Sequence, residues 1–252
     1  MENIRHILNE IEQRKNVKIL YACETGSRAW GFPSPDSDYD VRFIYVHERD
    51  WYLSLSQRKD TIEHMEGELD ITGWDLRKSL VLLKKSNAPL IERFQSPITY
   101  YADEVFRKEF KELIVQYYSP TGVFYHHYSL AQKFWEELKD QEKVKLKSYF
   151  YLIRSLLSCH WIIKDKSVLP MHIEGLMRLI NDERKNEMRE LVRLKAEADE
   201  KYFHKRDESL NEWIKELFEL LARSKDNLDV CKADNSALNG FFLKMVSANA
   251  DN

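Results

Sequence analysis

Three aspartates, Asp36, Asp38 and Asp40, stand within five residues, directly before a segment with the pattern of a β-strand. Apolar residues recur at every second position over residues 41–46, a period that is typical of a strand. Residues two apart on a strand face the same side, so Asp38 and Asp40 can direct both carboxylates at one point. Because like charges this close repel each other, the pattern also predicts a cation between them.

A second strand precedes the aspartates and is followed by a Gly-Ser pair. Residues 17–23 (VKILYAC) form a compact apolar run of the kind found in buried strands. Gly26 has no Cβ, so a ligand can approach its backbone closely. Ser27 and the N–H groups that open a short helix after it are then placed to hold a phosphate. Arg28 is either a further phosphate ligand or a plain surface charge, and we favour the first.

A third strand, predicted over residues 66–72 (EGELDIT), offers a third carboxylate. Its polar and apolar residues alternate, which places Asp70 on the polar face of a half-buried strand. Glu68 shares that face but lies further along the strand. Asp75 is better placed to cap the following helix, because its side chain can accept a hydrogen bond from a free N–H of the first turn. We expect Asp70 to be the third carboxylate, with Glu68 and Asp75 as the alternatives.

The chain changes character near residue 100. Before it, short strands alternate with helical segments such as residues 4–11, whose apolar residues recur at helical spacing. Beyond it, helical periodicity continues almost throughout, and the last residues lose it. The pattern predicts a mixed domain over 1–115, a helical domain over 116–224 and a loosely ordered tail over 225–252.

Two common nucleotide and metal motifs are each excluded by two positions. An EF-hand loop that began at Asp36 would need Gly sixth and Glu twelfth, where Val41 and His47 stand. Gly26 and Gly31 have the spacing of a Walker loop, but the Lys-Ser/Thr that must follow is absent. What remains is a set of carboxylates, the hard oxygen ligands that suit Mg²⁺. Two such ions, roughly 4 Å apart, can bind the attacking and leaving oxygens of a nucleotidyl transfer.

Three strings of the sequence, taken in order, resemble a known superfamily. The Gly-Ser pair, ten residues and then Asp38-Tyr39-Asp40 are similar to the signature of the DNA polymerase β-like nucleotidyltransferases. The fuller string GSRAWGFPSPDSDYDVRFIY, with LDITGWDLRK and SPITYY after it, is similar to a bacterial group of predicted nucleotidyltransferases. Some members of that group are associated with RNA ligases. The resemblance covers roughly residues 15–180.

The resemblance implies an α+β fold, with a small mixed β-sheet nucleotidyltransferase palm followed by a mainly helical domain. It implies transfer of a nucleoside monophosphate from an NTP such as ATP to an acceptor hydroxyl. Two Mg²⁺ ions would be the cofactors, with Mn²⁺ as their substitute. Asp38 and Asp40 would hold the ion that carries the triphosphate, and Asp70 would help to hold the second ion or act as the base. From the same-face spacing of the aspartates, we predict that Asp40→Asn abolishes transfer and, by removing a repulsive charge, raises the melting temperature of the metal-free protein.

One helical face in the second domain carries two cations and a phenol. Lys147, Tyr151 and Arg154 stand at i, i+4 and i+7 of a predicted helix over 143–163, so they share one side of it. The plain interpretation is a solvated flank whose long basic side chains lie along apolar neighbours. The resemblance favours a nucleotide-binding face. We therefore expect the helical domain to close over the nucleotide with these three residues facing it, while the Gly-Ser loop holds the β- and γ-phosphates.

The charge of the chain bears on its acceptor. A formal net charge of −3 gives no global attraction to nucleic acid, so a polyanionic acceptor would need a local basic face. The resemblance slightly favours an RNA end as the acceptor, with a protein hydroxyl or a small molecule as alternatives. A non-catalytic member of the same fold, which binds a nucleotide or a partner, is the second class of function.

Cysteine usage and hydropathy indicate the compartment. Cys23, Cys159 and Cys231 are odd in number and include no CxxC pair, which fits a reducing cytoplasm better than a disulfide framework. The N-terminal segment lacks the apolar core of a signal peptide, and no run is long enough to span a membrane. We expect a cytoplasmic protein without a membrane partner.

Overall fold

The computed structural model describes residues 2–225, 228 and 234–249. The chain forms two compact units. The sheet unit comprises Met1–Gly26, Asp38–Tyr118 and Lys232–Asn252, and the helical unit comprises Ser27–Ser37 and Ser119–Cys231. The chain therefore leaves the sheet unit between the two residues of the Gly-Ser pair and returns to it at the first aspartate of the Asp-x-Asp pair.

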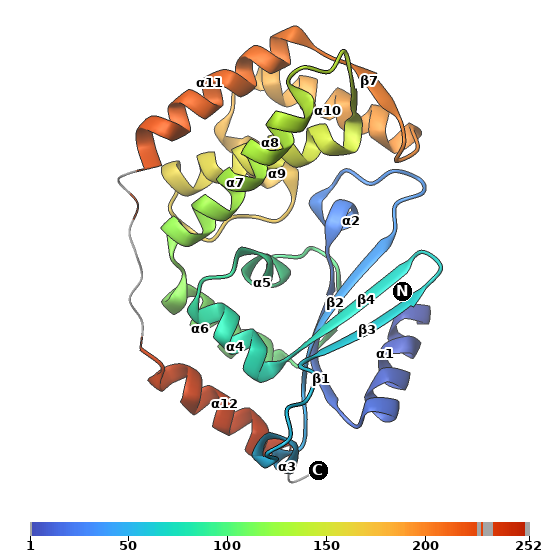
Figure 1. Ribbon diagram of the computed structural model, residues 1–252, viewed down its shortest axis with the longest axis vertical. Helices are drawn as coiled ribbons and strands as arrows, with labels where there is room; N and C mark the ends of the chain where they lie inside the picture. Colours follow the sequence, from blue (N-terminus) through green and yellow to red (C-terminus); the bar gives the residue numbers. More distant parts are fainter. Residues whose placement is uncertain (1, 226–227, 229–233, 250–252) are drawn as a thin grey trace. The chain divides into compact units, whose positions relative to one another are not determined.

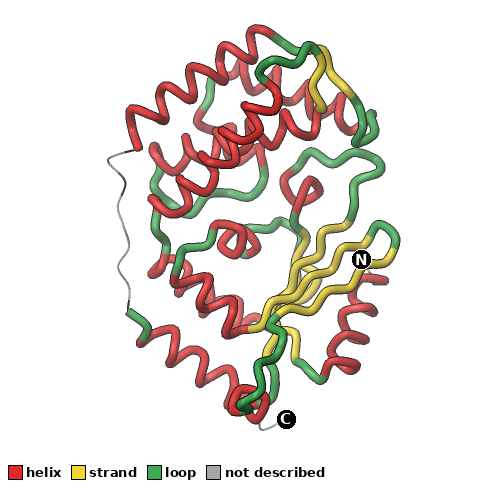
Figure 2. The backbone as a smooth tube through the Cα atoms, in the orientation of Figure 1, coloured by secondary structure: helices red, strands yellow, loops and turns green. Residues whose placement is uncertain are grey.

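The sheet unit is built on a mixed sheet, drawn in yellow in Figure 2. Its strands are β1 (Lys18–Glu24), β2 (Tyr39–Val46), β3 (Thr61–Glu66), β4 (Leu69–Asp75) and β5 (Thr99–Ala102). They lie in the order β3-β4-β2-β1-β5. The central strands β2 and β4 run parallel, whereas the other neighbouring pairs of this sheet are antiparallel. The parallel pair is the feature that positions the acidic site.

One face of the sheet is covered by helix α1 (Glu2–Lys15), as Figure 1 shows. Its apolar residues recur every three or four positions and form one buried stripe, consisting of Ile4, Ile7, Leu8 and Ile11. The stripe belongs to the same core cluster as Val41 and Phe43 of β2 and Ile71 of β4. Because side chains alternate along a strand, Asp40 and Asp70 leave the sheet on the opposite face.

Helices α4–α6 lie on that opposite side of the sheet (Figure 1). The remaining helices of the unit, with their bounds, are α3 (Arg49–Leu53), α4 (Leu76–Lys84), α5 (Ala88–Arg93), α6 (Glu104–Tyr117) and α12 (Ser236–Ala248). Stacked rings join helix and strand: Phe94 lies 4.7 Å from the Tyr21 ring and 4.4 Å from the Phe110 ring, centroid to centroid. Such stacking adds to the burial of apolar area on this face.

The helical unit is centred on α8, most of whose residues are buried. Its elements are α7 (Pro120–Leu138), β6 (Lys143–Lys145), α8 (Leu146–Lys164), α9 (Ile173–Leu176), the 3₁₀ helix η1 (Met177–Leu179), α10 (Asp182–Glu197), β7 (Phe203–Lys205) and α11 (Glu208–Ser224). Strands β6 and β7 pair antiparallel, with Val144 opposite His204. The short helix α2 (Gly26–Trp30) begins at the last residue of the sheet unit's first segment and continues into the helical unit.

The expected fold class is confirmed, because a small mixed sheet is accompanied by a mainly helical unit. Three element boundaries differ. The helix predicted over 143–163 begins at Leu146, after strand β6. The strand predicted over 66–72 is divided into the end of β3 and the start of β4, because Gly67 makes a tight turn there with φ at +57°. The helical run expected towards residue 221 is interrupted by β7, whose pairing with β6 is a long-range contact that helical periodicity does not reveal.

The division of the chain also differs from the one expected. The predicted boundary at 115/116 falls within α6, close to the observed change of unit after Tyr118, but residues 27–37 belong to the helical unit. The predicted tail over 225–252 contains helix α12, which packs in the sheet unit with Phe241 against Phe106 at 5.7 Å between ring centroids. Residues 226–227, 229–233 and 250–252 of that tail lie outside the described residues.

Cys23 and Cys159 are buried free thiols, and burial raises the pKa of Cys23 to about 12. Cys231 lies outside the described residues. In the part of the chain that the structure describes, no helix has both the length and the apolar character needed to cross a membrane.

A substitution at Gly73 of β4 tests how closely β4 packs against the side chains of β2. A Cβ at this position would lie 2.2 Å from Cζ of the Phe43 ring. Gly73→Ala should therefore displace the ring and lower the free energy of unfolding by about 1–3 kcal/mol, the usual penalty for overpacking. Urea titration of the variant and the parent measures the difference.

Gly240→Ala is the matched control, because a Cβ there would meet no heavy atom within 4 Å and the residue lies inside α12. It should be neutral or stabilising by up to about 1 kcal/mol, since Ala favours a helix over Gly. Equal unfolding free energies for Gly73→Ala and the parent would contradict the close packing.

Candidate active site

The acidic site lies at the beginning of the parallel strands β2 and β4. Asp40 is the register partner of Asp70, so the two side chains leave neighbouring strands on the same face. Both carboxylates converge on Arg42, whose Nη2 donates to Asp40 Oδ1 at 3.0 Å and to Asp70 Oδ2 at 2.8 Å. A guanidinium of the chain thus lies between Asp40 and Asp70, while a metal ion at Asp38 and Asp40 stays a prediction.

Arg42 is held by two further hydrogen bonds. Its Nη1 donates to the backbone oxygen of Val41 at 3.0 Å and to that of Asp70 at 2.8 Å. The Arg42 side chain is only 19% exposed, so these ion pairs are screened less than fully exposed ones. No prediction from the sequence included Arg42, although the same spacing of two residues that sets Asp38 beside Asp40 also sets Arg42 beside it.

Asp40 is held in addition by the residues that end β1. Its backbone N–H donates to Glu24 Oε1 at 2.7 Å, and its backbone oxygen accepts from Thr25 N at 2.8 Å. Gly26 follows with φ at +63°, and a Cβ there would lie 2.0 Å from Asp40 Oδ2. Only glycine meets both conditions without strain. The group that lies close to Gly26 in the structure is the Asp40 carboxylate, and the approach of a phosphate to this backbone stays a prediction.

Glu24 is a fully buried acid at the end of β1. Its Oε2 accepts a short hydrogen bond from the Tyr100 hydroxyl of β5, while its Oε1 accepts from the Asp40 N–H of β2. A buried carboxylate requires such donors, because leaving it without partners is strongly unfavourable. Glu24 therefore connects three strands next to Asp40. The available sequence signal was a charged residue placed directly after an apolar strand.

Asp75, one alternative for the third carboxylate, lies at the other end of β4. Its Oδ1 accepts from the Arg77 N–H at 2.8 Å and so caps helix α4, which confirms the predicted cap. Its Oδ2 accepts from the Tyr52 hydroxyl at 2.6 Å, and burial raises the pKa of Asp75. Both carboxylate oxygens of Asp75 thus make hydrogen bonds that stabilise the fold. Asp75 lies about five strand residues from Asp70.

Asp70 is the alternative that the structure brings to Asp40. Glu68 is exposed in the turn before β4 and is not part of that strand. Asp38 is exposed and directly precedes β2, where the chain re-enters the sheet unit. The contact that Asp40 and Asp70 share through Arg42 is consistent with the predicted choice of Asp70, and its catalytic role stays a prediction.

The carboxylates suit a divalent cation in chemistry. Over residues 2–225, 228 and 234–249, no group of three or more His, Cys, Asp and Glu side chains is arranged to hold a metal ion. Asp40 and Asp70 nevertheless each place an oxygen within 3.0 Å of one cationic nitrogen. Carboxylate oxygens are the ligands that Mg²⁺ prefers, so the pair suits this ion in ligand type. Binding of Mg²⁺ by Asp38, Asp40 and Asp70 stays a prediction.

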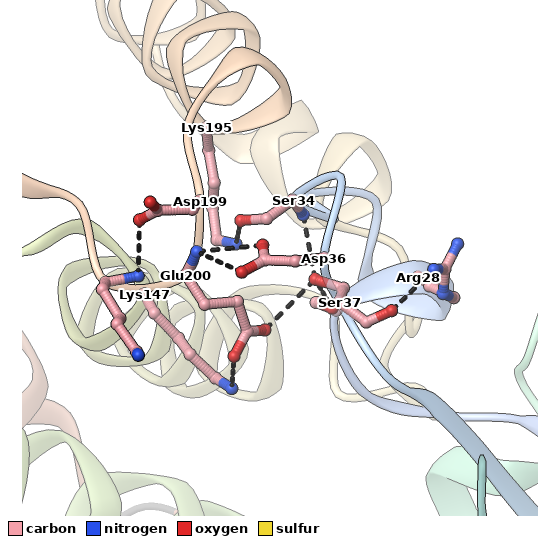
Figure 3. Close-up of polar contacts among 10 residues, drawn as sticks. Arg28, Ser34, Asp36, Ser37, Lys147, Lys195, Asp199 and Glu200 are labelled. Atoms are coloured by element: carbon pink, nitrogen blue, oxygen red, sulfur yellow. Dashed lines mark hydrogen bonds and ion pairs between the residues drawn. The ribbon is translucent and has the colours of Figure 1, made fainter. Parts of the chain in front are cut away.

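The Ser27 hydroxyl begins a chain of hydrogen bonds inside the helical unit. Ser27 Oγ donates to Ser37 Oγ at 3.0 Å, and Ser37 Oγ donates to Glu200 Oε1 at 3.2 Å. Glu200 Oε2 accepts from Lys147 Nζ at 2.6 Å, as Figure 3 shows. Ser27, predicted to hold a phosphate, and Lys147, predicted to face the nucleotide, are therefore linked to one carboxylate, Ser27 through Ser37. Ser37 and Glu200 were not predicted, because 163 residues separate them in the chain.

Residues 27–37 are fastened by two more contacts with the end of α10 and the turn after it (Figure 3). Lys195 Nζ donates to Ser34 Oγ at 2.6 Å, and the Glu200 N–H donates to Asp36 Oδ1 at 3.0 Å. Lys195 is 1% exposed, and burial lowers the pKa of its ammonium group. The loop after the Gly-Ser pair is thus fixed within the helical unit by polar contacts.

Arg28 acts on the same loop. Its Nη2 donates to the Ser37 backbone oxygen at 2.6 Å, which connects the two ends of the segment. Arg28 is half-buried, so the alternative of a plain surface charge does not describe it. Contact with a phosphate stays a prediction.

Tyr151 and Arg154 pack against the loop through Trp30. The Arg154 guanidinium lies 4.5 Å from the Trp30 ring centroid and donates to the Met171 backbone oxygen at 3.2 Å. The Tyr151 ring meets the same indole edge to face at 5.2 Å. Arg154 is 5% exposed, so a solvated flank does not describe it. Both residues position the loop that begins with Ser27, and their contact with a nucleotide stays a prediction.

The mixed sheet carries aspartates on its parallel pair of strands, and a Gly-Ser pair follows its first strand. This arrangement is consistent with a nucleotidyltransferase fold of the DNA polymerase β type. The chain belongs to RlaP, described as the RNA repair pathway DNA polymerase beta family, whose family model matches residues 1–244.

The chain is similar to two uncharacterized proteins. The chain is 40% identical over 243 residues to the uncharacterized protein YcgL of Bacillus subtilis (strain 168), covering 95% of this chain and 94% of that protein. It is 26% identical over 141 residues to the uncharacterized protein MJ0002 of Methanocaldococcus jannaschii, covering 54% of this chain and 56% of that protein.

With a guanidinium between the two carboxylates, the expectation that Asp40→Asn raises the melting temperature loses its physical reason. The repulsion that the substitution was to relieve is already neutralised by Arg42. Asp40→Asn removes one half of an ion pair instead.

Arg42→Gln should expose this repulsion. In metal-free buffer it should lower the free energy of unfolding by about 1–3 kcal/mol, the usual loss for hydrogen bonds to charged groups. Mg²⁺ should then raise the melting temperature of the variant more than that of the parent, because the carboxylates no longer have a competing cation. Differential scanning calorimetry with EDTA and with Mg²⁺ measures both effects.

Arg49→Gln, an equal change of charge at an exposed residue of α3, is the control and should leave both quantities near the parent values. If Arg42→Gln and Arg49→Gln behave alike, the guanidinium does not neutralise the acidic site.

Proposed function

We propose that this protein is a Mg²⁺-dependent nucleotidyltransferase that moves a nucleoside monophosphate from an NTP to an acceptor hydroxyl. Membership of a DNA polymerase β family suggests nucleotidyltransferase activity. The observation that carries the finer proposal is the convergence of Asp40 and Asp70 on one cationic atom, with Gly26 packed against Asp40. Such a carboxylate pair is what a metal-assisted transfer of a phosphoryl group requires.

The proposed reaction forms a bond between the acceptor oxygen and the α-phosphorus of the NTP. The bond from the α-phosphorus to the oxygen that bridges it to the β-phosphorus breaks, and pyrophosphate leaves with that oxygen. The proton of the acceptor hydroxyl passes to a base, for which Asp70 is the candidate. Bound Mg²⁺, held by Asp38, Asp40 and Asp70, would neutralise the negative charge of the triphosphate.

The residues after Gly26 are proposed to hold the triphosphate. Ser27 and Lys147 already act on a carboxylate in the helical unit, and phosphate oxygens accept hydrogen bonds from the same kinds of donor. Because Ser27 follows Gly26 directly, the chain itself joins this donor to the segment that holds Asp40. Arg28 closes the loop and is proposed to add a second cation.

An RNA end is the acceptor that we favour. The family description refers to an RNA repair pathway, and this supports RNA over a protein hydroxyl or a small molecule. The support comes from the family and not from charge, since the net charge of −3 favours no polyanion.

A non-catalytic nucleotide-binding role is the second candidate. The observation that favours it is the position of Arg42, because a guanidinium takes the place between the carboxylates that a catalytic cation would need. The two candidates differ in whether Arg42 can withdraw when nucleotide and metal are present.

Incubation with each labelled NTP, Mg²⁺ and total cellular RNA or protein tests the reaction. Label should appear in an acceptor with the parent protein and be abolished by Asp40→Asn, which removes a charged ligand of the proposed metal site. Glu68→Gln makes the same change of charge at an exposed turn residue and should transfer normally. Undiminished transfer by Asp40→Asn would overturn the assignment, and binding of NTP without any transfer would establish the non-catalytic role.

The salt dependence of acceptor binding separates an RNA from a small acceptor. For single strands the slope of log K against log salt is about −0.7 for each phosphate neutralised. We expect a slope that corresponds to several phosphates for single-stranded RNA, measured by fluorescence anisotropy from low to physiological salt. A shallow slope, together with no extension of any RNA end, would indicate a protein or small-molecule acceptor.

A further inference from the structure

Glu200 holds its carboxylate where the donors of the proposed phosphate site meet. Its Oε2 accepts from Lys147 Nζ at 2.6 Å, and its Oε1 accepts from Ser37 Oγ at 3.2 Å (Figure 3). The carboxylate is therefore bound by an ammonium group and a hydroxyl at once. These are the donors that also recognise the oxygens of a phosphate.

The direction of the hydrogen bonds is fixed by the number of protons available. A hydroxyl has one proton to donate and two lone pairs to accept with. Ser37 Oγ accepts from Ser27 Oγ at 3.0 Å and from the Ser34 N–H at 2.9 Å, and a carboxylate cannot donate. The Ser37 proton must therefore go to Glu200, and the Ser27 hydroxyl donates its own proton to Ser37 Oγ. The result is a preorganised anion site.

The site is accessible to water from one side, although the two serines at its bottom are buried. Ser37 is fully buried and Ser27 is 5% exposed, whereas the side chains of Lys147 and Glu200 are 34% and 22% exposed. An anion from solution can thus reach the donors from the side on which Glu200 lies. The Ser27 and Ser37 hydroxyls are buried, so water does not compete for their hydrogen bonds.

The charges around the site are balanced by Glu200. Three labelled cations, Arg28, Lys147 and Lys195, stand with three labelled anions, Asp36, Asp199 and Glu200, in the network of Figure 3. If the Glu200 carboxylate leaves, these cations outnumber the two remaining acids. The vacated site would then attract an anion.

The turn that carries Glu200 does not depend on its side chain. The Glu200 N–H donates to Asp36 through the backbone, and the Leu146 N–H donates to the Tyr202 backbone oxygen at 3.2 Å. Strands β6 and β7, which pair beside the turn, add backbone hydrogen bonds. The carboxylate can therefore be replaced by another anion while the turn stays in place.

We propose that Glu200 is an internal ligand of an anion site made by Lys147, Ser37 and, through Ser37, Ser27, and that the terminal phosphate of an NTP displaces it. The inference rests on the proposed function, because it assigns a phosphate of the same substrate to these donors. Breaking the contacts of the Glu200 carboxylate costs free energy. The parent protein therefore binds the nucleotide more weakly than it would without this competing carboxylate.

Calorimetric titration with inorganic tripolyphosphate, and separately with Mg-ATP, tests the proposal without any need for turnover. Glu200→Gln keeps the shape of the side chain but binds an ammonium group more weakly than a carboxylate does. It should bind both probes roughly tenfold more tightly than the parent, since one charge-assisted contact no longer competes. Lys147→Gln should weaken binding of both.

Two further variants distinguish displacement from a general effect of charge. Glu197→Gln changes the charge equally at an exposed residue of α10 and should bind like the parent. Glu200→Asp keeps the charge but shortens the side chain by one methylene, so it should also bind more tightly than the parent. It serves as the second test if Glu200→Gln does not fold.

The outcomes separate this inference from the proposed function. Tighter binding by Glu200→Gln and Glu200→Asp, with Glu197→Gln unchanged, supports displacement. Equal or weaker binding by both Glu200 variants overturns it, even if the parent transfers nucleotide normally. An equal gain in Glu197→Gln also overturns it, because the effect is then one of net charge. Absence of binding by every protein overturns both the inference and the proposed phosphate site.

Discussion

The acidic site depends on one ion-pair arrangement, the Arg42 guanidinium between Asp40 and Asp70. Two carboxylates can meet there because β2 and β4 are parallel and in register, so that equivalent side chains leave both strands at the same level. Their repulsion is tolerated because a cation on the same face as Asp40 lies within hydrogen-bond distance of both. The backbone around Asp40 is held separately by Glu24 and Thr25.

The residues that carry the proposed chemistry come from both units. Asp40 and Asp70 belong to the sheet unit, while Ser27, Ser37 and Lys147 belong to the helical unit. The chain connects the two sets at Gly26–Ser27 and at Ser37–Asp38, each by a single peptide bond. Both sets have a common property in this structure: each holds an internal counter-ion, a guanidinium among the carboxylates and a carboxylate among the hydroxyl and ammonium groups.

Local patterns in the sequence were sufficient where a residue's role depends on its neighbours. The same-face relation of alternate residues around Asp40 and the cap at Asp75 follow from backbone geometry over a few residues. Arg42 could have been found by the same argument. Glu24 was harder to find, since its partner Tyr100 is 76 residues away and lies on a strand that periodicity did not indicate.

The sequence by itself determined a mixed domain followed by a helical one and the residue types at the acidic site, because periodicity and the spacing of Gly, Ser and Asp are local properties, and the family resemblance added the class of fold. Only the tertiary structure decided which groups pair with the charged and polar side chains of the two sites. Arg42 meets Asp70 through strand pairing, and Glu200 reaches Ser37 across 163 residues of chain. Coulomb attraction and hydrogen bonding depend on distance in space. Separation along the chain says nothing about that distance until the elements have packed.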